Sequence, residues 1–479
     1  SRGLGDVYKR QDPRRRLQVG GSLFSDALYV RRDIDPQLIE LLAAGRFCHV
    51  VGPRQIGKSS LRNRTADRLE AQGARCVLID LTSFGRSVTI EQWYFGLMDL
   101  LAENLELSDP GPHWSAHQEL PPAQRWLRYL EAVVDQIQAP LVVFLDEIDV
   151  VRDMPFGQEF LATLRAAFEA RNQSPRLERV AFCLLGVFAP WDLCQDPSIT
   201  PLNVAHELRM GDFSRVEFDA FKSGISRLPG EGVAWLDAVY HWTDGHPYMS
   251  QKLLVHLTSC PPDAGVAAPD AVEAAVGVLF FQNPFDDPNL TAARVRFDRK
   301  DGRSSRAERL SLYREMLLEE RISLNTGEHV QTELLLSGMA RVRLSEGGPY
   351  LAVRNRIFAQ VFDRRWVRAQ SLHRWLNDEV EVWLESGRDP DRVPTGIRFD
   401  EAIAWARQRK DLTPEVEEFL RAGLEARLKA QERSAQLRYE KEHRRMWQTI
   451  AAVGTVGALL LISGLSWSIY RIKQEQGRW

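Results

Sequence analysis

The chain has 479 residues, of which 44% are hydrophobic and 27% are charged. This length exceeds what one hydrophobic core usually supports, so we expect about two to four domains. The net charge of -3 excludes a molecule-wide attraction to nucleic acid and leaves only local basic patches for such a role. Five cysteines without C-x-x-C spacing argue against a disulfide framework and indicate reduced, buried thiols.

The first part of the chain predicts a parallel sheet behind a short leader. Residues 1–11 have no initiator Met and no apolar signal-peptide run, and we expect a non-native leader because they resemble a translated sequencing-adapter scar. Over 12–215, short β-rich apolar runs alternate with longer helical patterns, which is typical of a parallel sheet covered by helices. The predicted strands are 47–51, 75–81, 141–145 and 179–186.

A complete phosphate-loop motif follows the first predicted strand. Residues 52–59 match G-x-x-x-x-G-K-[ST], and the strand before and helix after argue against a chance match in a glycine turn. The loop's N–H groups and the positive end of the next helix would hold phosphate oxygens. We expect Lys58 to bridge the β- and γ-phosphates and Ser59 to ligate Mg²⁺. The expected nucleotide-binding residues here are Gly52, Pro53, Arg54, Gln55, Ile56, Gly57, Lys58, Ser59 and Ser60.

A second motif begins where the apolar run 141–145 leads into Asp146 and Glu147. A strand buried on both faces would place Asp146 at its carboxyl end, where it can hold Mg²⁺ through water, and Glu147 can deprotonate the attacking water. The alternative, a solvated acidic turn, leaves the apolar strand and the upstream loop as coincidence. We therefore predict catalytic roles for Lys58, Asp146 and Glu147, with Ser59 and Asp146 as metal ligands. The run 179–186 should insert between the two motif strands, but the sequence identifies no γ-phosphate sensor after it.

At this point the chain resembles a known family, the bacterial AAA-like members of the STAND class, which are signal-transduction ATPases with numerous domains. Residues 245–247, Gly-His-Pro, look like the family's G-x-P element. The resemblance implies a helical lid over 216–290 and a position for Pro247 near the adenine. The matching segments are 29–30, 53–60, 79–82, 91–94, 146–149 and 240–248.

Residues 291–371 read as a winged-helix domain. Helical patterns over 306–320 and 329–337 precede a hairpin pattern over 339–354. Winged helices often bind DNA, and the basic residues could contact phosphates. The resemblance instead implies that the module packs on the nucleotide domain and keeps it closed, and the interspersed acidic residues favour this interpretation. The basic residues are Arg341, Arg343, Arg354 and Arg356, and the acidic ones are Glu328, Glu333 and Glu346.

The last part of the chain predicts a small helical unit, a stalk and a membrane span. Tryptophans at helical spacings over 372–412 indicate a packed unit, and Thr413-Pro414-Glu415 is a helix-start pattern for a charged stalk over 413–448. Residues 449–470 contain no charge and, at about 1.5 Å per residue, span a roughly 30 Å hydrocarbon core. The tail 471–479 is short, and we expect it to be truncated before a further domain.

These patterns together predict an α/β P-loop NTPase with an ASCE-type parallel sheet, then an all-α lid, a winged helix, a stalk and one transmembrane helix. We expect slow, switch-type hydrolysis of ATP to ADP with Mg²⁺, a homo-oligomer in the ATP state, and a single-pass protein of the bacterial inner membrane with its NTPase region in the cytoplasm. The protein signalling partner cannot be read from the sequence, and nucleic acid is disfavoured as a partner.

Two other classes of function stay open. One is a DNA-binding ATPase that resembles origin-recognition or transposition loaders, and the other is a nucleotide-binding membrane scaffold without turnover. Arg54 and Arg209 are candidates for γ-phosphate or inter-subunit contacts, but surface ion pairs explain them equally well.

Overall fold

The computed structural model describes residues 16–21, 23, 27–194, 196, 199–263, 265–319, 321–394, 396–407 and 412–476. The predicted leader, 1–11, and residues 477–479 of the predicted tail lie outside this range. The chain divides into two compact units, Ser1–Val367 and Arg368–Trp479. Each unit is described by itself.

The first unit contains a five-stranded parallel sheet in the order β2-β3-β4-β1-β5. The strand β4 lies between β1, which precedes the phosphate loop, and β3, which ends at Asp146. The predicted parallel α/β fold with one inserted strand is therefore confirmed, while the edge strand β5 was not predicted. The strand bounds are β1 (Cys48–Val51), β2 (Arg75–Asp80), β3 (Leu141–Asp146), β4 (Val180–Gly186) and β5 (His206–Arg209).

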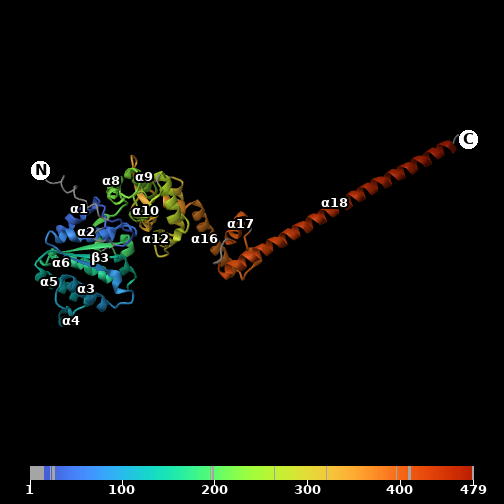
Figure 1. Ribbon diagram of the computed structural model, residues 1–479. Helices are drawn as coiled ribbons and strands as arrows, with labels where there is room; N and C mark the ends of the chain where they lie inside the picture. Colours follow the sequence, from blue (N-terminus) through green and yellow to red (C-terminus); the bar gives the residue numbers. More distant parts are fainter. Residues whose placement is uncertain are drawn as a thin grey trace. The chain divides into compact units, whose positions relative to one another are not determined.

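Helices cover both faces of this sheet (Figure 1). Because side chains alternate along a strand, Val143 and Leu145 of β3 enter one core while Val142 and Phe144 enter the other. Burial on both faces explains why these strands read as continuous apolar runs. The first core receives α3 (Ile90–Leu105), α5 (Pro122–Ile137) and α6 (Gly157–Ala170), and the second receives α1 (Ile34–Ala43) and α2 (Lys58–Glu70). The short helices here are α4 (Gly111–Ala116) and α7 (Pro190–Leu193).

The rest of the first unit is mainly helical and has its own core, which includes Phe280, Tyr313 and Phe358. A small antiparallel sheet, in the order β6-β8-β7, follows within it. Helices and a hairpin stand where the sequence predicted them, and the two-residue strand β6 was not predicted. The bounds are α8 (Arg215–Phe218), α9 (Gly232–Thr243), α10 (Pro247–Ser259), α11 (Ala268–Val276), α12 (Pro288–Phe297), α13 (Arg306–Leu317), β6 (Ile322–Ser323), α14 (His329–Ser337), β7 (Ala340–Ser345), β8 (Gly348–Val353) and α15 (Arg356–Val361).

The second unit holds most of α16 (Arg364–Glu385), then α17 (Ile397–Ala406) and α18 (Pro414–Gln476). The first turns of α18 pack with the other two helices around Trp383, Phe399 and Phe419, and this core reaches Leu420.

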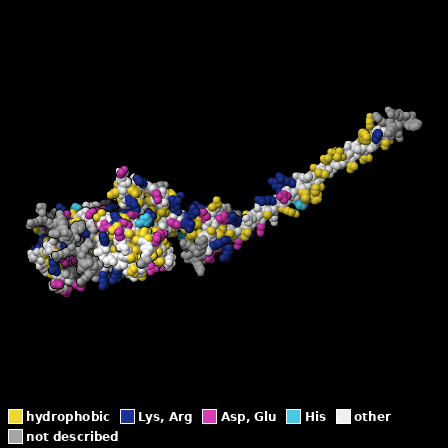
Figure 2. Space-filling model, turned by 45° about the horizontal axis from the view of Figure 1, so that its top comes forward, with side chains coloured by type: hydrophobic (Ala, Val, Ile, Leu, Met, Phe, Trp, Pro, Cys, Tyr) yellow, Lys and Arg dark blue, Asp and Glu magenta, His cyan; other side chains and the backbone are white. Residues whose placement is uncertain are grey.

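The remainder of α18 continues as one helix whose side chains are exposed throughout 427–456. Figure 2 shows charged side chains along its first part and mainly hydrophobic ones along its last part. Among the described residues, α18 alone is long and apolar enough, by length and composition, to cross a membrane.

Candidate nucleotide-binding site

The loop between β1 and α2 has the backbone shape that a phosphate cradle requires. Gln55 and Gly57 have positive φ angles of 60° and 102°, which turn the chain sharply before α2 begins at Lys58. The Lys58 ammonium donates hydrogen bonds to the carbonyls of Gly52 at 3.0 Å and Pro53 at 3.2 Å. Burial lowers the pKa of Lys58, while the negative charges of Glu147, Asp149 and Asp146 oppose that shift. The predicted lysine therefore lies inside its own loop and close to the carboxylates at the end of β3.

The serines of the motif form the first turn of α2. Ser59 is half-buried, and Ser60 is buried and accepts a hydrogen bond from the Leu23 N–H at 3.4 Å. Helix α2 starts two residues before Ser60, so Ser60 lies inside the first turn rather than at its beginning. Its hydroxyl is engaged by the N-terminal segment, and the role of Ser59 as a metal ligand stays a prediction.

The acidic pair lies at the carboxyl end of β3. Asp146 is 4% exposed, and its Oδ2 lies 2.7 Å from the Arg62 guanidinium of α2. Its Oδ1 accepts the Glu147 N–H at 3.0 Å. Glu147 has a φ of 55°, and burial, followed by the charge of Asp149, raises the pKa of its carboxyl. A carboxyl with a raised pKa beside the phosphate loop is the property expected of a general base.

Asp149 connects this acidic turn to the inserted strand. Its Oδ1 accepts the Val187 N–H at 3.0 Å, just beyond the end of β4. A Cβ on Gly186 would lie 2.6 Å from the same oxygen, so only glycine allows this approach. The ends of β3 and β4 are therefore fixed to each other beside the phosphate loop.

A cationic group from α12 also faces this place, and sequence reasoning missed it. Arg296 lies 4.0 Å from Asp192, which follows β4, and Arg299 lies 3.5 Å from the same carboxylate. Burial, then the charge of Arg299, lowers the pKa of Arg296 to about 10, and the charge of Arg296 in turn lowers the pKa of Lys58. Nothing in the sequence marks it, because one arginine on an amphipathic helix looks like a solvated side chain.

The arginines named from the sequence are placed differently. Arg54 is exposed, and its carbonyl accepts a 3.5 Å hydrogen bond from the Asn289 amide of α12. Arg209 pairs with Glu207 on the edge strand β5. Between these two, only Arg54 belongs to the phosphate loop.

Arg32 supports the phosphate loop from the N-terminal segment. Its guanidinium donates to the Ile56 carbonyl at 2.6 Å and to the Gly211 carbonyl at 3.2 Å. It also lies over the ring of Phe213, with 4.3 Å to the centroid. This one side chain therefore links the segment before α1, the end of the loop and the turn after β5.

Pro247 is buried at the first position of α10, directly after Gly245 and His246. Gly245 has a φ of 80°, and a Cβ there would lie 2.0 Å from the Phe213 carbonyl. Glycine is therefore required where the chain passes Phe213. The proximity of Pro247 to an adenine stays a prediction.

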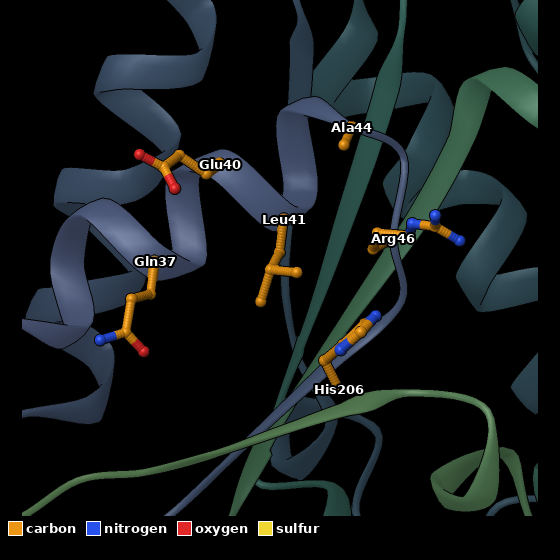
Figure 3. A pocket seen from close by; sticks show the side chains of 6 residues that line it. All are labelled: Gln37, Glu40, Leu41, Ala44, Arg46 and His206. Atoms are coloured by element: carbon orange, nitrogen blue, oxygen red, sulfur yellow. The ribbon is translucent and has the colours of Figure 1, made fainter.

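The hollow in Figure 3 lies elsewhere on the sheet. It has a volume of about 590 Å³ between α1 and the beginning of β5. Arg46 precedes β1 and His206 begins β5, so the hollow lies at the amino ends of these strands. The phosphate loop follows the carboxyl end of β1, at the opposite end of the strand. We give it no part in nucleotide binding. Its lining residues are Gln37, Glu40, Leu41, Ala44, Arg46 and His206.

The oxygen donors at the phosphate loop fit Mg²⁺. This ion prefers oxygen ligands and takes few from the protein when it also binds phosphate. Ser59 lies three residues before Arg62 and so on the same side of α2. Because Arg62 touches Asp146, the side of α2 that carries Ser59 is turned towards the end of β3.

Comparison with known proteins places this site in a family. The chain is 28% identical over 406 residues to an uncharacterised WD repeat-containing protein of Synechocystis, a match that covers 81% of this chain and 34% of the relative. The chain thus spans about a third of that relative's length. Among solved structures, the Walker-type ATPase of Pyrococcus abyssi has a TM-score of 0.50 at 16% identity, covering 72% of this chain and 99% of that one.

A second solved structure, the ORC2 protein of Aeropyrum pernix, has a TM-score of 0.44 at 14% identity and covers 76% of this chain and 99% of that one. The similarity to the Pyrococcus abyssi ATPase shows a similar fold. Residues 20–263, just over half of the chain, match the AAA-like domain family. The chain therefore belongs to the AAA-like domain family, with the parallel-sheet fold of P-loop NTPases.

Proposed function

We propose that this protein is a membrane-anchored STAND-type ATPase that works as a switch between ADP-bound and ATP-bound states. We assign 12–215 to the NTPase domain, 216–290 to a helical lid and 291–371 to a winged-helix domain. We assign 372–412 to a small helical unit, 413–448 to a stalk, 449–470 to a transmembrane helix and 471–479 to a tail. The roles below rest on these assignments.

The observation that carries the proposal is that the C-terminal half of the first unit touches the phosphate loop. The Asn289 amide lies 3.5 Å from the Arg54 carbonyl, and a Cβ on Gly338 would lie 3.3 Å from Pro53. In addition, Arg354 lies 2.7 Å from Asp212, which lies in the turn after β5. A loop that changes shape with its nucleotide would change these contacts, which is what a switch requires.

The residues of the loop and the acidic pair can divide the work of hydrolysis. The Lys58 ammonium, now hydrogen-bonded to two loop carbonyls, would turn to the β- and γ-phosphate oxygens. Glu147 would orient the attacking water and take its proton, and its raised pKa favours that transfer. When bound to Ser59 and Asp146, Mg²⁺ would neutralise charge that develops on the phosphates.

In this switch, the lid and the winged-helix domain would move together. With ADP bound, Asn289 and Gly338 would keep their contacts with the loop, and the Asp212–Arg354 pair would hold the winged helix closed. A signal would favour opening, exchange for ATP and self-association into a homo-oligomer. Hydrolysis through Glu147 would return the protein to the closed state.

The membrane anchor is the apolar part of α18. ATP is available in the cytoplasm, so we propose a single-pass protein of the bacterial inner membrane with the NTPase region on the cytoplasmic side. Protease added to spheroplasts should leave the stalk intact, and protease added to inverted vesicles should cut it. Cleavage from outside would refute this orientation. The WD repeats named for the Synechocystis relative lead us to propose a repeat domain as the sensor of the whole protein.

A DNA-binding role has less support, because three of the four basic residues that it would use already have acidic partners. Arg341 lies 3.4 Å from Asp244, which also pairs with Arg343, and Arg354 pairs with Asp212. DNA would have to displace these carboxylates. Salt-dependent DNA binding that disappears in an Arg341→Ala, Arg343→Ala double variant would revive the alternative, and absence of binding at low salt would dismiss it.

The proposed activity is tested with two measurements on the purified full chain in detergent. Fluorescent ATP and ADP should bind with Mg²⁺ and fail to bind the Lys58→Ala variant. Phosphate release should fall about 10²–10⁴-fold in the Glu147→Gln variant, which keeps nucleotide, while the exposed Glu103→Gln control stays at the wild-type rate. Binding without any difference in phosphate release between the proteins would instead identify a scaffold without turnover.

A further inference from the structure

The Asp146 carboxylate at the end of β3 is paired with a cation of the protein itself. Arg62 Nη1 lies 2.7 Å from Asp146 Oδ2, and the two side chains are 13% and 5% exposed. The other oxygen, Oδ1, accepts the Glu147 N–H at 3.0 Å. Both oxygens of a carboxylate that should serve a metal are therefore engaged within the protein.

The position of Arg62 means that its guanidinium and a bound divalent ion would compete for Asp146. Arg62 lies one turn after Ser59 on α2, so its side chain leaves the same side of the helix as the Ser59 hydroxyl. A divalent ion held by Ser59 and Asp146 would stand close to the guanidinium, in a buried place where like charges repel more strongly than in water. The two cations cannot share Asp146 Oδ2 without a loss for one of them.

A second hydrogen bond holds Arg62 on its own helix. Its Nε donates to the Asn63 Oδ1 at 3.1 Å while its Nη1 contacts Asp146. The guanidinium can therefore leave Asp146 without losing its hydrogen bond to Asn63.

We propose that Arg62 is an internal counter-cation that holds Asp146 in the nucleotide-free protein and gives up Oδ2 when Mg²⁺ arrives with the nucleotide. Arg62 is a positioning residue that sets how much Mg²⁺ is needed to retain nucleotide. Without metal it keeps the buried carboxylate paired and in place, and with metal it leaves Oδ2 while keeping its hydrogen bond to Asn63. This inference rests on the proposed function, because it assumes a nucleotide whose metal reaches Ser59 and Asp146.

The experiment is a Mg²⁺ titration of nucleotide binding by the full chain in detergent. Fluorescent ADP is kept at a fixed concentration, Mg²⁺ is varied from an EDTA-treated start, and the midpoint is compared between variants. The Arg62→Gln variant should need about tenfold less Mg²⁺ than wild type, because the competing charge is gone. Arg62→Lys, which keeps the charge, should stay within about threefold of wild type. Arg68→Gln, an exposed arginine on the same helix, should not move the midpoint.

The outcomes separate the inference from the proposed function. If wild type binds the nucleotide with Mg²⁺ and Arg62→Gln has an unchanged or higher midpoint, Arg62 is a permanent structural partner and the inference is overturned. If wild type binds no nucleotide at any Mg²⁺ concentration, the proposed function fails and the inference falls with it. Should Arg62→Gln fail to fold, Arg62→Met, which removes the charge and keeps most of the side-chain length, takes its place in the same titration. A midpoint for Arg62→Met that equals or exceeds the wild-type midpoint would overturn the inference.

Discussion

Arg354 Nη2 and Asp212 Oδ1 lie 2.7 Å apart, and each side chain is only 3% exposed. Burial alone would raise the pKa of Asp212, but the neighbouring charge of Arg354 above all brings it below its ordinary value. This pair joins the turn after the parallel sheet to the residue that follows β8. It is the most deeply buried ionic contact between those two parts among the described residues.

Removing one partner of that pair should destabilise the protein strongly. Arg354→Ala leaves the buried Asp212 carboxylate with only the more distant Arg341, at 3.9 Å, and we expect the free energy of unfolding in urea to fall by about 3 kcal/mol. Glu169→Gln breaks an ion pair in which the Glu169 side chain is 58% exposed, so it should cost under about 1 kcal/mol. In the proposed switch, Arg354→Ala should also speed release of fluorescent ADP. Slower release would contradict the closed-state role.

Gly245 allows a test in which strain and steric conflict are separated. Gly245→Ala places a Cβ 2.0 Å from the Phe213 carbonyl at a φ of 80°, and we expect a loss of more than about 3 kcal/mol in unfolding free energy. Gly230→Ala has a similar φ of 75° but no atom within 4 Å of the new Cβ, so its cost should be about 1 kcal/mol. Thermal unfolding of both variants checks this. Equal losses would show that the contact with Phe213 is not as close as described.

Stability should depend on pH through His246. Burial, then the charge of Arg354, lowers the pKa of His246 from 6.5 to about 3 in the folded protein. Between those values the unfolded chain binds a proton that the folded chain does not, so stability rises with pH in this window. The contribution of His246 is complete above about pH 6.5 and is lost as the pH falls towards 3.

The measurement is the free energy of unfolding at several pH values between 4 and 7, compared with the His246→Asn variant. Asparagine can still cap α10 but does not titrate. The difference between the two proteins should change by at most about 1.4 kcal/mol per pH unit, with wild type losing more as the pH falls. A difference that is constant over this range would mean that His246 is not shielded from protonation.

Arg296 should affect the preference for ATP over ADP. Its charge is close enough to Lys58 to lower the pKa of that lysine, and a γ-phosphate would be held beside Lys58. We expect Arg296→Gln to reduce the ratio of ATP affinity to ADP affinity about tenfold, because one favourable charge is removed. Competition binding measures this ratio. Arg294→Gln, on the same helix but stacked on Phe285, serves as the control and should leave the ratio unchanged.

The part of the fold that was predictable is the part whose signal is local. The runs that became β1, β3 and β4 are apolar because both faces of the sheet are covered, and the loop at 52–59 identifies itself by its own residues. The edge strand β5 has only Leu208 buried among four residues, so it lacks both an apolar run and a clear alternation. It could not be distinguished from a polar loop.

The rest of the candidate site depends on contacts between distant parts of the chain. Arg62 and Asp146 are 84 positions apart, and Arg354 and Asp212 are 142 apart. One sequence carries no record of which charges meet after folding, because a buried arginine and a solvated one look alike. The placement of Pro247, Ser59 and Glu147 around a nucleotide stays a prediction for the same reason.

The guanidinium of Arg32 has a practical consequence for anyone who trims this protein. It holds the Ile56 carbonyl at 2.6 Å from a position sixteen residues ahead of β1, outside the stretch that forms the sheet. A shortened version that starts at the first strand would keep every residue of the phosphate loop but would lose the Arg32 side chain that holds the loop. We expect such a version to hold nucleotide more weakly than one that begins before Arg32, a difference that equilibrium dialysis of the two would reveal.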